Sequence, residues 1–208
     1  MATRADAAKP VLKLVLLAAV LTAIVALVAS VTHERIQHNE QAWISQRLDA
    51  LVAPATHDND LLTDSIAVIA PDLLGSSQPV RIYRARRAGA PVAAVIRAIA
   101  PDGYRGPIEL LVAIGQDSRL IGVQVIRHDE TPGLGDAFES RDVHWLDHFR
   151  GRSLTDPPPP RWTVRRDGGD FDAFTGATIT PRAIVKAVRN ALDYYQRNSK
   201  QIFDLPSQ

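Results

Sequence analysis

Residues 80–126 read VRIYRARRAGAPVAAVIRAIAPDGYRGPIELLVAIGQDSRLIGVQVI, and this stretch decides the fold. Its β-branched and apolar residues follow a period of two in four runs, a pattern typical of strands: Val80–Arg86, Val92–Ala100, Ile108–Ile114 and Leu120–Ile126. Glycine-containing loops at 87–91 and 115–119 suit hairpin connections. Strands joined as successive hairpins predict an antiparallel sheet.

The sequence predicts helices before and after the residues of the predicted sheet. Apolar residues from Glu34 to Val52 keep helical spacing between charged ones, which predicts an amphipathic stalk that Pro54 ends. A last helix is expected from Thr180, a good N-cap before Pro181. Its apolar face contains Ile184, Val185, Val188, Ala191, Leu192 and Tyr195. This arrangement predicts an α+β domain in which helices flank a central antiparallel sheet.

Shorter elements are predicted at further places. Ile66–Ile69 is a weak apolar element in an otherwise mixed segment. Ser140 is placed to cap a short helix, whose inward-facing residues are Val143, Leu146 and Phe149. The prolines at 157–160 predict a stiff surface connector, and Trp162–Arg165 predicts an edge strand.

The segment Leu14–Val31 reads LVLLAAVLTAIVALVASV and contains no charge. With Val11 and Leu12 it gives roughly 20 residues, which at about 1.5 Å each span the ~30 Å hydrocarbon core of a membrane as a helix. A cleaved secretory signal ending near Val28-Ala29-Ser30 is the alternative. The apolar run exceeds the usual signal core of about 7–15 residues, which favours a retained anchor in the lipid bilayer.

The charges before this segment predict its orientation. Arg4, Lys9 and Lys13 precede the apolar run, so the positive-inside rule places a tail, residues 1–10, in the cytoplasm. Residues 11–31 then form the span, 32–79 a stalk helix and connector, 80–200 an exported domain and 201–208 a C-terminal tail. In a bacterium this describes a single-pass protein of the cell inner membrane with its bulk in the periplasm.

Composition excludes several functions. The 24 basic and 23 acidic residues nearly balance, which argues against a nucleic-acid-binding protein. The absence of cysteine excludes disulfides, iron–sulfur clusters and thiolate zinc sites. Of the six histidines, His144 and His148 stand four apart, but they flank Trp145 in a short helical segment, so a protein-bound metal is not expected. A hydrolase nucleophile motif and a complete dinucleotide-binding glycine motif are also missing.

The segment Asp167–Thr180, DGGDFDAFTGATIT, stands immediately before the last predicted helix. Glycines and small hydroxyl residues at a helix N-terminus suit a phosphate, because free backbone N–H groups and the positive end of the helix dipole point there. An ordinary capping loop has the same composition. Both interpretations stay open on these residues alone.

The same segment resembles the flavinylation motif Asp-x-x-(Ser/Thr)-Gly-Ala-Thr of FMN-binding domain proteins. All the specified positions are matched, by Asp172, Thr175, Gly176, Ala177 and Thr178. The chain is also similar to the G subunit of the Rnf (Rsx) complex at three runs: 100–104 (APDGY), 130–136 (ETPGLGD) and 166–172 (RDGGDFD). The resemblance covers nearly the whole chain and is weakest at 50–80 and at the prolines 157–160.

The resemblance implies a function. In that family a flavin transferase couples FMN through its phosphate to the final threonine, here Thr178. The chain would then be a non-autonomous electron carrier within a membrane-bound, ion-translocating ferredoxin–NAD oxidoreductase, with other membrane subunits as its partners.

Different functions are also compatible with parts of the pattern. The C subunit of the sodium-translocating NADH–quinone oxidoreductase shares the Thr-linked FMN domain, but the shorter chain and the runs at 100–104 and 130–136 argue against it. A membrane-tethered flavin redox sensor and an anchor without cofactor are two further interpretations, and the sequence decides against neither.

The loop Glu130–Gly135 is the first candidate for contact with the flavin ring. Gly133, Leu134 and Gly135 allow backbone N–H groups to approach a flavin edge, and Thr131 can donate a hydrogen bond. A tight turn after the strand 120–126 is the alternative.

The remaining candidate residues are weaker. His128, Asp129 and Glu130 are interpreted as solvated loop residues rather than acid–base groups. Trp145, Phe149 and Trp162 are expected in the core rather than stacked on a ring. Arg182 and Lys186 are placed where they could neutralise a phosphate.

Overall fold

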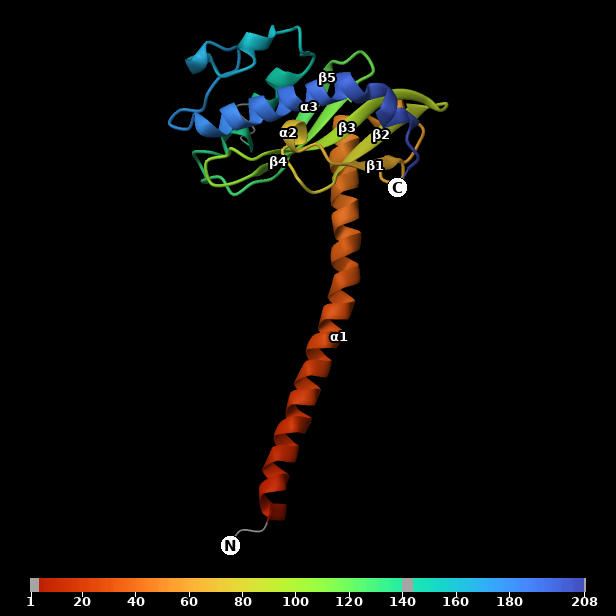
Figure 1. Ribbon diagram of the computed structural model, residues 1–208, viewed down its shortest axis with the longest axis vertical. Helices are drawn as coiled ribbons and strands as arrows, with labels where there is room; N and C mark the ends of the chain where they lie inside the picture. Colours follow the sequence, from red (N-terminus) through yellow and green to blue (C-terminus); the bar gives the residue numbers. More distant parts are fainter. Residues whose placement is uncertain (1–3, 140–143, 208) are drawn as a thin grey trace. The chain divides into compact units, whose positions relative to one another are not determined.

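The computed structural model describes residues 4–139 and 144–207 and divides into two compact units, which meet at Ile44 and Ser45 (Figure 1). The helix α1, Arg4–Leu51, passes through this division. In the first unit, Lys13–Ser30 has a mean hydropathy of 2.4 and is long and apolar enough to cross a membrane. Its two hydroxyl side chains bond within the helix: Thr22 Oγ1 donates to the Ala18 carbonyl and Ser30 Oγ to the Leu27 carbonyl, each at 2.8 Å.

The second unit is built on an antiparallel sheet of five strands in sequential order. The strands are β1 Ser65–Val68, β2 Val80–Arg87, β3 Ala90–Ala100, β4 Ile108–Gly115 and β5 Leu120–Arg127. The predicted runs are therefore confirmed as strands, and the weak element at Ile66 is the first strand. The sheet begins within the segment that the sequence assigned to the connector.

One face of the sheet packs against α3, Ile179–Asp204. The cross-strand row Ile82, Ile96, Val112 and Val123 lies on this face, in one hydrophobic core with the apolar side of α3. The face of α3 predicted from the sequence is fully buried. The short helix α2, Pro71–Leu74, contacts α3 beside it (Figure 1).

The end of α1 packs on the opposite face. The row Tyr83, Val95, Ala113 and Gly122 lies there, and an added Cβ at Gly122 would be 3.0 Å from Leu51 Cδ2. Glycine in β5 therefore lets the α1 side chain approach the sheet closely. Helices flank both faces, which confirms the predicted α+β class.

The start of α3 differs from the prediction. The N-cap is Thr178, and the first helical residue is Ile179, so Thr180 already lies inside the first turn. Thr180 is buried, and its hydroxyl donates to Glu130 instead of to a helix end. The Thr180 side chain, which local propensity assigned to capping, is therefore hydrogen-bonded to Glu130, a residue distant in the sequence.

The edge strand expected at Trp162–Arg165 is wrong. This segment lies between two short 3₁₀ helices, Pro159–Arg161 and Arg165–Asp167, and forms only one bridge, from Val164 to Phe171. Its backbone hydrogen bonds stay within the loop, because Gly169 and Phe171 fold back onto Val164 and Thr163. An added Cβ at Gly169 would lie 1.8 Å from the Thr163 carbonyl oxygen, so only glycine permits this close approach.

The aromatic residues Trp145, Phe149 and Trp162 are buried, which confirms their assignment to the core. They form a cluster of ring contacts with Phe171 and Phe174. Trp145–Phe149 is a 3₁₀ helix, whereas the expected cap Ser140 and the inward-facing Val143 lie outside the described residues.

The proline segment is only partly the surface connector that was predicted. Pro157 is buried after a cis peptide bond, and Pro158, Pro159 and Pro160 are exposed.

Candidate functional site

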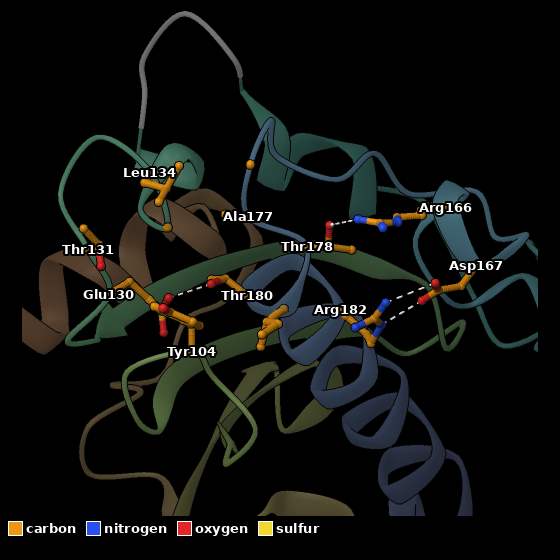
Figure 2. Close-up of a pocket in the computed structure, with 13 residues that line it drawn as sticks. Tyr104, Glu130, Thr131, Leu134, Arg166, Asp167, Ala177, Thr178, Thr180 and Arg182 are labelled. Atoms are coloured by element: carbon orange, nitrogen blue, oxygen red, sulfur yellow. Dashed lines mark hydrogen bonds and ion pairs between the residues drawn. The ribbon is translucent and has the colours of Figure 1, made fainter.

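A cavity of about 590 Å³ lies beside the first turn of α3, and Figure 2 shows the side chains around it. Small-molecule sites commonly occupy about 300–1,000 Å³. Its lining residues are Tyr104, Glu130, Thr131, Leu134, Gly135, Arg166, Asp167, Gly176, Ala177, Thr178, Ile179, Thr180 and Arg182.

Two motifs that are distant in the sequence meet at this cavity. Gly176 has φ +79°, and an added Cβ there would be 3.2 Å from Leu134 Cδ1. Four residues further on, Thr180 Oγ1 donates to Glu130 Oε2 at 2.5 Å. The structure thus brings Thr131, Leu134 and Gly135 together with Gly176, Ala177 and Thr178.

Thr178 offers a hydroxyl that the helix does not use. A threonine N-cap ordinarily adopts an extended backbone and accepts a hydrogen bond from the first turn. Thr178 instead has φ −93° and ψ −24°, and its side chain makes no capping hydrogen bond. Its Oγ1 lies 3.4 Å from Arg166 Nη1, and the residue is half-buried at the cavity wall (Figure 2). The oxygen is therefore free to carry a substituent.

The two arginines near Thr178 differ in whether they are paired with a carboxylate. Arg182 forms a bidentate pair with Asp167, with Nε–Oδ2 at 2.7 Å and Nη2–Oδ1 at 3.0 Å. The hydrogen bond from Arg182 lowers the pKa of Asp167, and the nearby Arg166 lowers it further. The same hydrogen bond raises the pKa of Arg182. Arg182 is thus committed to a carboxylate, whereas Arg166 faces the Thr178 hydroxyl.

Lys186 does not line the cavity. Its Nζ lies 2.5 Å from Asp102 Oδ2, one turn further along α3. Lys186 and Arg182 were expected to be available to neutralise a phosphate. In the structure each of them is paired with an aspartate.

Three of the expected site residues lie outside the cavity lining. The Asp172 carbonyl accepts a hydrogen bond from Trp145 Nε1 at 2.9 Å, and its carboxylate pairs with Arg165 at 3.1 Å. Thr175 is exposed. Gly133 has φ +76°, and its N–H donates to Asp136 Oδ1 at 2.7 Å, so it shapes the loop. Asp172 fastens the motif to the aromatic core rather than reaching the cavity.

The interpretation of Glu130 as a solvated loop residue is wrong. Its side chain accepts hydrogen bonds from Thr180 and from the Arg105 backbone, and only 4% of the residue is exposed. Asp129 is exposed as expected, and His128 contacts Glu139 at 3.0 Å.

Sequence reasoning also missed Tyr104, Arg166 and Ile179 as cavity residues. Tyr104 and Arg166 fall in the runs that carried the family resemblance, which is the signal that could have found them. Ile179 lay beyond the end of the recognised motif and gave no separate signal.

The fold and the cavity define an FMN-binding domain, because residues 103–193 match the model of that family. Residues 1–51 match the RnfG N-terminal region. One match covers the first unit, and the other lies within the second.

Whole-chain relatives agree with these matches. The chain is 47% identical over 196 residues to the G subunit of the ion-translocating oxidoreductase complex of Pseudoalteromonas atlantica, covering 94% of this chain and 91% of the relative. It is 45% identical over 193 residues to that of Shewanella baltica, covering 93% and 91%, and 45% over 196 residues to that of Yersinia pestis, covering 93% and 92%. The chain belongs to the RnfG family of ion-translocating oxidoreductase complexes, which confirms the resemblance and favours it over the quinone-reductase alternative.

The residues of the cavity fit an FMN group. The unused Thr178 hydroxyl and the facing Arg166 suit a phosphoester, whose charge is about −1. Tyr104, Leu134 and Ile179 are 64%, 43% and 45% exposed and present apolar surface around the cavity. Such surface suits a large flat ring that would otherwise face water.

Proposed function

We propose that this chain is the flavoprotein subunit of a membrane-bound ion-translocating ferredoxin–NAD oxidoreductase, and that it carries FMN as a phosphoester on Thr178. The observation that carries the proposal is the N-cap hydroxyl of α3, which lines the cavity and is not used by the helix. The identity to RnfG-family relatives over more than nine-tenths of the chain supports the assignment to such a complex.

When bound, FMN supplies a ring that accepts and releases one or two electrons. The chain's own residues would have four tasks there. Thr178 fixes the position of the phosphate, and Arg166 offsets its negative charge. Leu134 and Ile179 would offer the ring apolar surface and exclude water from it, while Gly135 keeps the loop backbone close to the cavity.

Asp172 and Thr175 serve attachment rather than binding in this proposal. Both match the flavinylation motif but lie outside the cavity lining. Thr175 is exposed and accessible to a flavin transferase, and Asp172 holds the motif on the aromatic core through Trp145. Gly176 and Ala177 complete the turn that delivers Thr178 to the cavity.

The location follows from the apolar helix and its flanking charges. We assign Lys13–Ser30 as the single span in the inner membrane, with the basic N-terminus in the cytoplasm and the FMN-binding domain in the periplasm. A tether prevents loss of the cofactor on that side. The electron partners are then other membrane subunits of the complex.

Thr178→Val tests the proposal. The full-length protein is produced together with a flavin transferase, denatured and separated on a gel, and its fluorescence and intact mass are measured. Wild type should fluoresce and carry the mass of one FMN, and Thr178→Val should show neither. Thr155→Val, at an exposed threonine remote from the cavity, is the matched control and should remain loaded. An unmodified Thr178 in wild type would refute the proposal.

The same variant separates an electron carrier from a flavin sensor. When it replaces wild type in a complex that still assembles, a carrier role requires loss of electron flow through that complex. Undiminished flow would leave the redox-sensor interpretation.

A further inference from the structure

Glu130 is a buried acid that lines the cavity. Its Oε1 accepts a hydrogen bond from the Arg105 N–H at 3.1 Å, and its Oε2 accepts one from Thr180 Oγ1 at 2.5 Å (Figure 2). Two glycines pack against it: an added Cβ would lie 2.7 Å from Oε2 at Gly135 and 3.0 Å from Oε1 at Gly103. The carboxylate is therefore held in one position by the loop before β4, the loop after β5 and the first turn of α3.

This carboxylate is the unpaired charge of the cavity. Among the lining residues, Asp167 and Arg182 neutralise each other, and Arg166 faces the oxygen that would carry the phosphoester. Within residues 4–139 and 144–207, no Lys, Arg or His side chain forms an ion pair with Glu130. Both of its oxygens lie within hydrogen-bond distance of a donor on another element, Thr180 Oγ1 and the Arg105 N–H. One buried negative charge is left when the others are matched.

A buried charge acts strongly on its neighbours. Water screens an exposed carboxylate, but the effective dielectric constant falls inside a protein, so the same charge has a larger effect at a given distance. Reduction adds negative charge to a group in the cavity. A fixed carboxylate in the same cavity opposes that addition and favours the oxidised form.

We infer that the charge of Glu130 tunes the flavin in this cavity. It holds the midpoint potential of the flavin at a more negative value than a neutral residue would. The inference rests on the proposed attachment of FMN at Thr178. Glu130 could instead serve only as a structural link between α3 and the loops around it. In that case the midpoint potential would not depend on whether the residue at position 130 is charged.

The test is a spectroelectrochemical titration of the full-length, flavin-loaded protein in detergent at one fixed pH. Glu130→Gln keeps the size of the side chain and removes its charge, and it should move the midpoint potential to a more positive value. Glu130→Asp keeps the charge and should shift it by less than half as much. Glu109→Gln is the matched control, because Glu109 pairs with Arg97 on the sheet and does not line the cavity. It should leave the potential unchanged.

Equal potentials for wild type, Glu130→Gln and Glu109→Gln would overturn the inference. So would a Glu130→Gln protein that folds but holds no flavin, because Glu130 would then act in attachment.

If Glu130→Gln does not accumulate, Thr180→Val replaces it. This variant removes the hydroxyl dipole that offsets the carboxylate and should shift the potential to a more negative value, with Thr180→Ser as its unchanged control. No shift in Thr180→Val would again overturn the inference. Loss of flavin from wild type would contradict the proposed function instead, so the two failures are distinguishable.

Discussion

Replacing Arg84 by methionine tests how the end of α3 is held to the sheet. The Arg84 side chain comes from β2 and is almost completely buried, with 1% of the residue exposed. Its Nε donates to Asp64 Oδ1 at 2.7 Å. Its Nη1 donates to the carbonyls of Ile202 at 3.0 Å and Leu205 at 2.5 Å. One cation therefore joins β2, the segment before β1 and the last turn of α3.

The magnitude follows from these contacts. Removing one partner of a buried ion pair costs about 3–5 kcal/mol. Asp64 keeps a second partner, Arg86 Nε at 2.9 Å, and its side chain is 16% exposed, so the cost lies at the lower end, at about 3 kcal/mol. For a protein of this size each kcal/mol lowers the melting temperature by about 2–4 °C, so we expect Arg84→Met to melt about 6–12 °C below wild type.

The assay is thermal unfolding of the full-length protein in one detergent, followed by circular dichroism. Arg97→Met is the matched control, because the Arg97 side chain is 35% exposed in its ion pair with Glu109. Such a pair contributes about 0–1 kcal/mol, so its loss should lower the melting temperature by about 4 °C or less. A loss in Arg84→Met no larger than that in Arg97→Met would refute the reasoning.

Two further substitutions follow from the cavity. Gly176→Ala should lower the free energy of unfolding in urea by about 1–2 kcal/mol, because φ +79° strains alanine and its Cβ would crowd Leu134. Gly133→Ala is the control: an added Cβ there meets nothing within 4 Å, so this variant should show only the smaller effect of backbone strain. Asp167→Asn should change the pH dependence of melting. The folded-state pKa of Asp167 is lowered by Arg182, so the pair stabilises the protein above the ordinary aspartate pKa of about 3.9 and this contribution disappears as pH falls through the folded-state pKa. The melting temperature of wild type should be higher than that of Asp167→Asn at neutral pH, and the two melting temperatures should converge in acid. A difference that stays constant with pH would contradict this.

The sequence predicted those parts of the fold that depend on local pattern. Period-two alternation located the strands β2 to β5 to within two residues, and helical spacing located the buried face of α3. Both patterns arise because each residue's side of the element is fixed by its position, whatever the distant contacts are. The flavinylation motif was recognisable because its residues are contiguous in the chain.

The parts that were missed depend on distant partners. Thr180 has the propensity of a cap, but Glu130, fifty residues away, takes its hydroxyl. Glu130 itself appeared solvated because acids in loops usually are, and only its packing against Gly103 and Gly135 buries it. The segment Trp162–Arg165 has strand composition, yet the close approach of Gly169 folds its backbone back on itself.

On the proposed function, covalent attachment and the cavity make separate contributions to holding a flavin. A flavin held without a covalent bond needs most of its surface buried to bind tightly. Here Tyr104, Leu134 and Ile179 line the cavity and offer apolar surface to a ring. The ester to Thr178 removes the need for that burial, because attachment no longer depends on affinity. A ring attached in this way would not have to be fully enclosed to be retained, and the buried carboxylate of Glu130 would act on it from the cavity wall.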